Sequence, residues 1–116
     1  MNTRETGCTG EKRAASYLEA KGIQILERNF RCRFGEIDLI GREGGCIVFV
    51  EVKYRSSVSM GRPEEAVDFR KQRRICRAAL YYLSSRHLEN CSVRFDVIAI
   101  LGEDITHFEH AFEFHG

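Results

Sequence analysis

Two charged residues stand in the most apolar stretch of the chain. Residues 47–53 read Ile-Val-Phe-Val-Glu-Val-Lys, a run rich in β-branched residues that is apolar on both faces until Glu51 and therefore predicts a central β-strand. Glu51 and Lys53 are two positions apart, so on a strand both side chains point to the same face. A buried carboxylate without a partner is destabilising, so Glu51 requires a hydrogen-bond donor, an opposite charge or a bound cation.

A second carboxylate precedes this strand. Residues 34–40 also predict a strand, and residues 42–45, which end in a Gly-Gly pair, predict the turn that joins the two strands as an antiparallel hairpin. Asp38 and Glu51 are separated from this turn by similar numbers of residues. The register of the hairpin is therefore expected to place the two carboxylates near each other.

This combination of groups favours a site for a divalent cation. Two neighbouring carboxylates repel each other, and one lysine does not compensate both charges. Mg²⁺ prefers one or two carboxylates together with water and phosphate oxygens, and we expect Mn²⁺ to substitute for it. With Asp38 and Glu51 as ligands and Lys53 orienting or deprotonating the attacking water, the predicted reaction is phosphodiester hydrolysis. A Glu-x-Lys pair alone is more often an ordinary ion pair, and its place in the hairpin is what favours catalysis here.

The rest of the chain predicts a single α/β domain spanning residues 1–116. We expect a helix, three strands, a second helix, a strand and a C-terminal tail, in that order. The helices are expected from about Cys8 to Lys21, ended by Gly22, and from Pro63 to about Ser84; the strands from Ile23 towards Phe30 and at residues 34–40, 47–53 and 93–101; a loop at 56–62; and a last strand or an irregular cover of the sheet at 105–114.

Periodic patterns predict the buried faces of these elements. On strand 34–40, alternation puts the carboxylates on one side of the sheet and the aliphatic residues on the other: Glu36 and Asp38 against Ile37 and Leu39. The apolar residues of the second helix predict its buried stripe: Phe69, Cys76, Ala79, Leu80 and Leu83. The last predicted strand has an apolar face as well: Phe95, Val97, Ala99 and Leu101.

Composition excludes several classes of protein. With 43% hydrophobic and 30% charged residues, the chain is too apolar to be disordered. No apolar run approaches the roughly 18 residues of a membrane span and no signal region is evident, so we expect a cytoplasmic protein without membrane association. The five cysteines are scattered without a Cys-x-x-Cys pair, which favours buried reduced thiols over disulfides or zinc. The net charge of +1 means that any attraction to nucleic acid must come from local patches.

Four segments resemble the signatures of the bacterial YraN-like family. They are Gly35-Glu36-Ile37-Asp38-Leu39-Ile40, Val48-Phe49-Val50-Glu51-Val52-Lys53-Tyr54-Arg55, Lys71-Gln72-Arg73-Arg74-Ile75 and Arg94-Phe95-Asp96-Val97. The resemblance covers nearly the whole chain. The element order, with Asp38 on the second strand and Glu51-Val52-Lys53 on the third, also resembles the PD-(D/E)XK nuclease superfamily, although Gly35 precedes the acidic motif instead of the proline in the superfamily's name.

This resemblance implies a restriction-endonuclease-like αβββαβ core, a mixed central sheet flanked by helices. It implies a magnesium-dependent endonuclease in which Asp38, Glu51 and Lys53 are catalytic. Similarity to archaeal Holliday junction resolvases implies that Glu11, on the first helix, joins Asp38 and Glu51 as a metal ligand, and that the substrate is DNA, including branched or recombination intermediates. Cutting both strands of a duplex or junction needs two active sites, which a homodimer would supply.

Arginines form two basic clusters. Arg70, Arg73, Arg74 and Arg77 have the spacing of one helical face, which is either a rail that binds phosphates or a solvated face paired with acidic neighbours. Arg28, Arg31 and Arg33 precede the catalytic hairpin and could position a nucleic-acid backbone. The residues that we expect to contact nucleic acid are Arg33, Arg55, Arg70, Lys71 and Arg74.

The remaining polar residues have structural interpretations. Glu36 is either an additional ligand or a solvated strand-end residue, and the second is favoured. Asp96 is expected to form a structural hydrogen bond or ion pair. His107 and His110 are expected at the surface, because no further ligand completes a metal site with them.

Three functions remain open at this stage. The first is a metal-dependent DNA endonuclease. The second is a nucleic-acid-binding module of the same fold whose site is catalytically weak or inactive. The third is a structural or adaptor domain in which the acidic pair only stabilises the hairpin.

Overall fold

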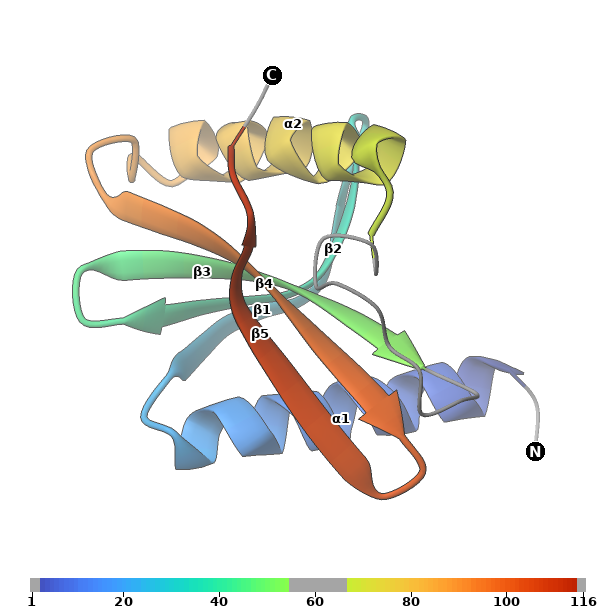
Figure 1. The fold of residues 1–116 in the computed structure, drawn as a ribbon. Coiled ribbons are helices and arrows are strands. Elements are labelled where there is room, and N and C mark those ends of the chain that lie inside the picture. The colour runs from blue at the N-terminus through green and yellow to red at the C-terminus, as the bar shows by residue number, and fades with distance from the viewer. Residues whose placement is uncertain (1–2, 55–66, 115–116) are drawn as a thin grey trace.

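A five-stranded mixed sheet lies between two helices, α1 on one face and α2 on the other (Figure 1). The computed structural model describes residues 3–54 and 67–114, and their side chains from residue 10 onward. The elements are α1 (Thr3–Ala20), β1 (Gln24–Cys32), β2 (Gly35–Glu43), β3 (Cys46–Tyr54), α2 (Phe69–Ser85), β4 (Ser92–Leu101) and β5 (Asp104–Phe112). The predicted α/β class and element order are confirmed, and the tail is a strand.

Strand pairing follows chain order, β1-β2-β3-β4-β5. The neighbours β1/β2, β2/β3 and β4/β5 are antiparallel, whereas β3 and β4 are parallel and are connected through α2. A parallel pair needs such a crossover connection, so the helix between β3 and β4 sets the mixed character of the sheet. Among the described residues, no helix is long and apolar enough to cross a membrane.

Each helix buries one face against the sheet. On the α2 side, the core includes Phe49, Tyr82 and Phe95. On the α1 side, the core includes Leu18, Val50 and Ile98. The strands β3 and β4 contribute to both clusters, which explains why their sequences are apolar on both faces.

The strand β2 bends away from β3 in its first half. The β2/β3 register begins at Leu39, paired with Val50, and runs from there to the turn. Ile37 packs in the α2-side cluster and Leu39 in the α1-side cluster, so the prediction that both lie on one side of the sheet is wrong. The bend at Asp38 interrupts strict alternation, and Figure 1 shows this end of β2 rising towards α2.

The helix α2 begins later than predicted. Its N-cap is Asp68, whose Oδ1 accepts a hydrogen bond of 2.8 Å from the backbone N–H of Lys71. Pro63 and the predicted loop at 56–62 lie outside the described residues. Val67, directly before the cap, is fully buried in the core, whereas Phe69 is 65% exposed.

The predicted buried stripe of α2 is correct for Cys76, Ala79 and Leu83 and wrong for Phe69 and Leu80. Leu80 is 49% exposed because it lies on the helix face of Arg77 and not on the buried face.

Candidate functional site

Asp38 marks the point where β2 and β3 separate. Beyond the Leu39–Val50 pair, the backbone N–H of Val52 donates a 2.8 Å hydrogen bond to Asp38 Oδ2. The side chain thus takes the place of the missing strand partner and satisfies the amide. Because this bond fixes the carboxylate, Asp38 is held against the β3 segment that carries Glu51.

Glu51 is the buried carboxylate of the site. The residue is only 4% exposed, and its Oε1 lies 2.6 Å from the Nζ of Lys71 on α2. Its second oxygen, Oε2, is buried and has no hydrogen-bond partner among the described residues. An orphaned buried oxygen is uncommon because it forfeits hydration without compensation, and it often indicates a missing ligand, ion or water.

The two carboxylates perturb each other. Burial, followed by the charge of Asp38, raises the pKa of Glu51 to about 7. Burial also raises the pKa of Asp38, although the bond from Val52 and the charge of Lys71 oppose this shift. Both shifts disfavour a doubly ionised pair, so an additional positive charge would stabilise the site.

The start of α2 positions the lysine. The Asp68 cap fixes the first turn, and Gln72 Nε2 donates a 2.8 Å hydrogen bond to the carbonyl of Val67. Lys71, the third residue of the helix, therefore reaches Glu51 from a fixed backbone position. Burial alone would lower the pKa of Lys71, but the hydrogen bond and charge of Glu51 outweigh it and raise that pKa.

A cavity of about 490 Å³ opens over the acidic pair. Its described lining consists of Glu11, Asn29, Arg31, Gly35, Glu36, Asp38, Glu51, Lys71, Arg74 and Ile75. The volume lies within the range of small-molecule sites, roughly 300–1,000 Å³. The cavity joins residues from α1, β1, β2, β3 and α2, so the fork between β2 and β3 brings together parts of the chain that are distant in sequence.

Glu11 faces the acidic pair from α1. Burial, then the charge of Asp38, raises its pKa, and a hydrogen bond from Asn29 opposes the shift. Among the described residues, however, no three His, Cys, Asp or Glu side chains are arranged to hold a metal ion. A Glu11–Asp38–Glu51 ligand set therefore stays a prediction, while Asp38 and Glu51 are close enough to interact directly.

Lys53 occupies a different place from Lys71. Alternation along β3 directs it to the face of Glu51. Yet within the described structure it does not line the cavity and forms no ion pair with either carboxylate. The predicted catalytic role of Lys53 is untested, and Arg55, the next predicted nucleic-acid contact, lies outside the described residues.

The predicted basic face of α2 is present. Its four exposed arginines line a shallow groove of about 290 Å³: Arg70, Arg73, Arg74 and Arg77. Within the described ranges, none of the four forms an ion pair with an acidic residue. Arg74 lines both this groove and the acidic cavity, so the two are contiguous.

Two residues of the site were not assigned to it from the sequence. Lys71 is one of the residues predicted to contact nucleic acid, and no local pattern indicates that it pairs with Glu51 across α2 and β3. Asn29 has a positive φ of 52° and falls opposite Asp38 in the β1/β2 ladder, between the pairs formed by Arg28 and Phe30. Asparagine tolerates this conformation better than most residues, but its sequence context gave no signal.

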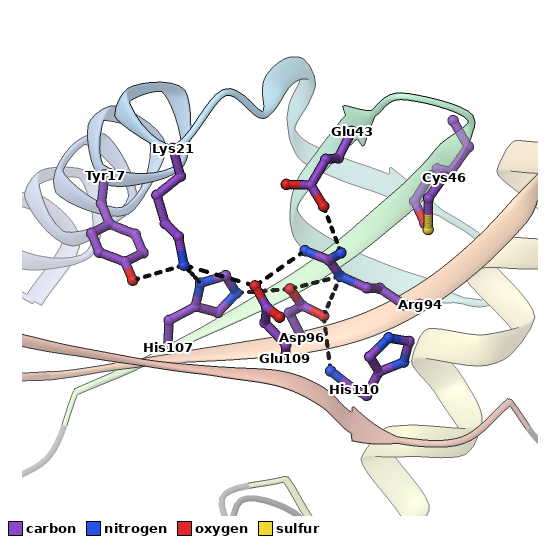
Figure 2. A network of polar contacts seen from close by, with 10 residues as sticks. Tyr17, Lys21, Glu43, Cys46, Arg94, Asp96, His107, Glu109 and His110 are labelled. Carbon is purple, nitrogen blue, oxygen red and sulfur yellow. Dashed lines mark hydrogen bonds and ion pairs between the residues drawn. The ribbon is translucent and has the colours of Figure 1, made fainter.

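A second polar network lies on the α1 side of the sheet (Figure 2). Asp96 is fully buried, and its carboxylate bonds to Arg94 Nε at 3.1 Å and His107 Nε2 at 2.7 Å. It also accepts a bond from the backbone N–H of His110. Burial raises the pKa of Asp96, but these bonds and the charge of Arg94 outweigh it, so the pKa is lowered. The predicted structural role of Asp96 is confirmed.

The prediction of two surface histidines is wrong for His107. Its side chain is only 2% exposed, because pairing of β5 with β4 carries it onto Asp96. The His107 ring meets the Tyr17 ring edge-on, with 5.6 Å between ring centroids, and its Nδ1 lies 3.4 Å from Lys21 Nζ. The network therefore connects β5 to α1. His110 is exposed, as predicted.

The cysteines fit the expectation of reduced thiols in part. Cys76 is buried, whereas Cys32, Cys46 and Cys91 are half-buried, and all four are free. The side chain of Cys8 lies outside the described residues.

Comparison with known proteins agrees with the resemblance to the YraN-like family, which covers nearly the whole chain. A family model described as "Uncharacterised protein family UPF0102" matches residues 10–100. A UPF0102 protein of Lachnoclostridium phytofermentans is 51% identical over 117 aligned residues, covering 100% of this chain and 99% of that protein. A UPF0102 protein of Syntrophus aciditrophicus is 54% identical, covering 82% of this chain and 75% of that protein. The YraN-like resemblance is thus confirmed at the level of the family, and the chain belongs to UPF0102.

Proposed function

We propose that this protein is a metal-dependent endonuclease that hydrolyses phosphodiester bonds in DNA at the Asp38–Glu51 cavity. The observation that supports this proposal is the buried Glu51 carboxylate, which faces Asp38 and whose Oε2 accepts no hydrogen bond from a donor in the part of the chain that the structure describes. A purely structural carboxylate at this depth would be expected to have both oxygens satisfied.

The donor set fits a hard divalent cation. Asp38 and Glu51 supply two carboxylates, and Mg²⁺ commonly uses only one or two, together with water and substrate oxygens. The cavity beside them has room for such oxygens. When bound, Mg²⁺ or Mn²⁺ would polarise a phosphate oxygen and neutralise developing negative charge. Glu11 lies close enough to Asp38 to raise the negative potential of the cavity.

The two lysines have separate roles in this proposal. Lys71 holds Glu51 in place and offsets part of its charge before the cation binds. Lys53, on the same face of β3, orients the attacking water once substrate fills the cavity, as the sequence motif predicts. The fixed backbone of α2 keeps Lys71 near the scissile phosphate, where its positive charge would stabilise the transition state.

The arrangement of the elements supports placement in the PD-(D/E)XK superfamily. Asp38 on β2 and Glu51 on β3 match the acidic positions of the superfamily motif, with Lys53 at its lysine position, and α2 follows β3 in the order that the resemblance implies. The basic groove of α2 opens beside the cavity and would bind the phosphates that flank the cleaved bond. We extend the proposal to branched DNA and recombination intermediates on the basis of the resolvase resemblance.

Cleavage assays test the proposal. Wild-type protein should cut linear or branched DNA with Mg²⁺ or Mn²⁺ and not with EDTA, and Glu51→Gln should remove cleavage. Glu36→Gln is a suitable control, because Glu36 lies in the same cavity but is exposed and pairs with Arg31 at 3.3 Å. Full activity in Glu51→Gln would refute the mechanism.

A nucleic-acid-binding module with an inactive site is the second candidate. It is favoured by the absence of a three-ligand cluster among the described side chains and by Lys71, which already neutralises part of Glu51. Binding of DNA without cleavage, under every metal and substrate that is tried, would support this candidate over the enzyme.

A further inference from the structure

An aromatic groove lies next to the basic groove of α2. It has a volume of about 430 Å³ and is lined by Arg33, Phe34, Arg77, Leu80, Tyr81 and Ser84. Leu80 and Tyr81 are 49% and 46% exposed, although both are large and apolar. Apolar surface of this kind at the rim of a polar site often marks a binding surface.

The rings in this groove form a platform open to solvent. Phe34, at the β1–β2 turn, lies 6.0 Å from Tyr81 between ring centroids. The guanidinium of Arg33 stacks on Phe34, with Cζ 4.8 Å from the ring centroid. Phe30, which packs against the α2-side core, lies 6.3 Å from Tyr81 between ring centroids. The platform is therefore assembled from two separate elements and held by packing.

The platform continues the path that begins at the acidic cavity. Arg74 borders the cavity, Arg77 lies one turn further along α2, and Tyr81 lies one turn beyond Arg77. Arg77 lines both the basic groove and the aromatic groove. One face of α2 thus changes from positive to aromatic with distance from Glu51.

We propose that this platform binds an unpaired base, so that the preferred substrate contains a single-stranded segment. Arginines that bind the backbone, together with aromatic rings that stack on bases, are the features that single-stranded nucleic acid requires. A base inside a duplex has both faces stacked already and cannot offer one to Tyr81. The part of the proposal that concerns cleavage rests on the proposed nuclease function, whereas binding at the platform does not.

The helix also specifies where the unpaired base lies. Ten positions separate Lys71 from Tyr81, which corresponds to about 15 Å along the helix axis. At the spacing of about 3.4 Å between stacked nucleotides, this distance spans about four nucleotides. The base on the platform should therefore lie about four nucleotides from the scissile phosphate.

Charge argues against a second copy of this chain as the occupant of this groove. Arg33 and Arg77 form no ion pair within the described part of the chain, so two uncompensated cations flank the rings. A second copy of this surface would bring like charges together, whereas a polyanion would neutralise them. The occupant that matches both rings and cations is a nucleic-acid strand.

Binding without cleavage tests the platform directly. The affinity of full-length protein for labelled single-stranded DNA, single-stranded RNA and duplex DNA would be measured by fluorescence anisotropy in EDTA. Tyr81→Ala and Tyr81→Leu should weaken binding of the single strands by about tenfold, the effect of losing one stacked base. Tyr81→Phe keeps the ring and should stay within about twofold of wild type. Duplex binding should change much less.

A measurement on the unmodified protein guards against misfolded variants. 2-Aminopurine, a fluorescent base quenched by stacking, would be placed at successive positions of a single strand bound to wild-type protein. Quenching at one position supports the platform. Uniform fluorescence at all positions, or an equal loss of duplex and single-strand affinity in Tyr81→Ala, would overturn it.

The two proposals can fail separately. If wild-type protein cleaves DNA but Tyr81→Ala binds single strands normally, the nuclease stands and the platform falls. If Tyr81→Ala weakens single-strand binding but no metal supports cleavage by the wild-type protein, base binding at the platform is supported and the nuclease proposal is refuted. If Tyr81→Ala weakens binding of single-stranded RNA and of single-stranded DNA by the same factor, the Tyr81 ring contacts the unpaired base and not the sugar.

Discussion

Lys71 Nζ lies 2.6 Å from Glu51 Oε1, and this ion pair joins the first turn of α2 to the strand β3. The lysine satisfies only one of the two carboxylate oxygens, since Oε2 has no hydrogen-bond partner in the described structure. The pair is therefore a partial neutralisation of a site that still carries excess negative charge from Asp38.

Stability without divalent metal should depend on pH through Glu51. Its pKa is about 7 in the folded protein against an ordinary value of 4.5, so the folded state binds more protons than the unfolded state between these values. The free energy of unfolding should therefore fall as pH rises through this window, by on the order of 3 kcal/mol at most. Urea unfolding of wild-type protein in EDTA at several pH values would measure the fall, which Glu51→Gln should largely remove.

Divalent metal should oppose this loss of stability. Above pH 7 the ionised pair Asp38 and Glu51 can bind Mg²⁺, whereas at pH 5 protons compete for the same oxygens. Mg²⁺ should thus raise the melting temperature more at pH 8 than at pH 5, following the usual linkage between ligand binding and folding. Scanning calorimetry of wild type and Asp38→Asn would check this. An equal rise in both proteins would place the metal elsewhere.

Removal of the Lys71 charge should have opposite effects on folding and on metal binding. Lys71→Met leaves the buried Glu51 without its counter-charge and should cost about 1–2 kcal/mol at pH 8, a figure reduced by the partial exposure of the lysine. The same change should tighten Mg²⁺ binding, since a competing cation is lost. Denaturant titration and calorimetric Mg²⁺ titration would measure the two effects.

The matched variant is Lys53→Met. It removes the other lysine considered for the site, which lies on the same face of β3 as Glu51. It should leave stability and metal affinity nearly unchanged, because Lys53 forms no ion pair with Asp38 or Glu51 among the described contacts. If Lys53 orients the attacking water, cleavage should still fall by about 100-fold or more. A loss of metal affinity in Lys53→Met and not in Lys71→Met would reverse the assigned roles.

The basic face of α2 should act through phosphates. Arg73→Ala should weaken duplex binding similarly for all sequences and should lower the slope of log affinity against log salt by about 0.9 for each phosphate contact that is lost. Arg42→Ala is the control, because this exposed arginine lies at the β2–β3 turn and bonds to the carbonyl of Gly44. Measurement of DNA affinity at several salt concentrations compares the two variants. An equal change of slope in Arg73→Ala and Arg42→Ala would show that the basic face of α2 is not a specific phosphate-binding surface.

The network at Asp96 should contribute stability and no catalysis. Asp96→Asn removes the buried charge that pairs with Arg94, whose guanidinium keeps its ion pair with Glu43, and should destabilise the fold by about 1–3 kcal/mol. The pKa of Asp96 is lowered, so its contribution is present above the ordinary value near 4 and is lost as pH falls through the folded-state pKa. Asp104→Asn, at an exposed position in β5, should change little. Thermal unfolding from pH 3 to 7 compares the two variants.

The sequence was sufficient to predict the element order and the meeting of Asp38 and Glu51. Both depend on short-range patterns: an apolar strand interrupted by one carboxylate, and a hairpin whose Gly-Gly turn sets the register. The agreement of these local signals with the tertiary arrangement explains why the prediction of the fold is confirmed.

Longer-range features could not be predicted in the same way. The partner of Glu51 depends on where α2 begins, and the Asp68 cap fixes the helix start from which Lys71 reaches the strand. The burial of His107 depends on the pairing of β5 with β4, which no pattern in the tail specifies. The placement of Ile37 in the α2-side cluster, and not with Leu39 in the α1-side cluster, likewise depends on packing between elements that are distant in sequence.

The hydrogen bond from Val52 to Asp38 also satisfies a backbone amide of β3 beyond the last residue pair of β2 and β3. Where two strands diverge, the backbone amides of each become available to a strand from another molecule, which is how sheets recruit neighbours and aggregate. Asp38 occupies the amide that β3 would otherwise offer at this fork. The residue that is proposed to bind the metal therefore also completes the hydrogen bonding of the β3 backbone, and a substitution at Asp38 would change the local structure of β3 as well as the charge of the cavity.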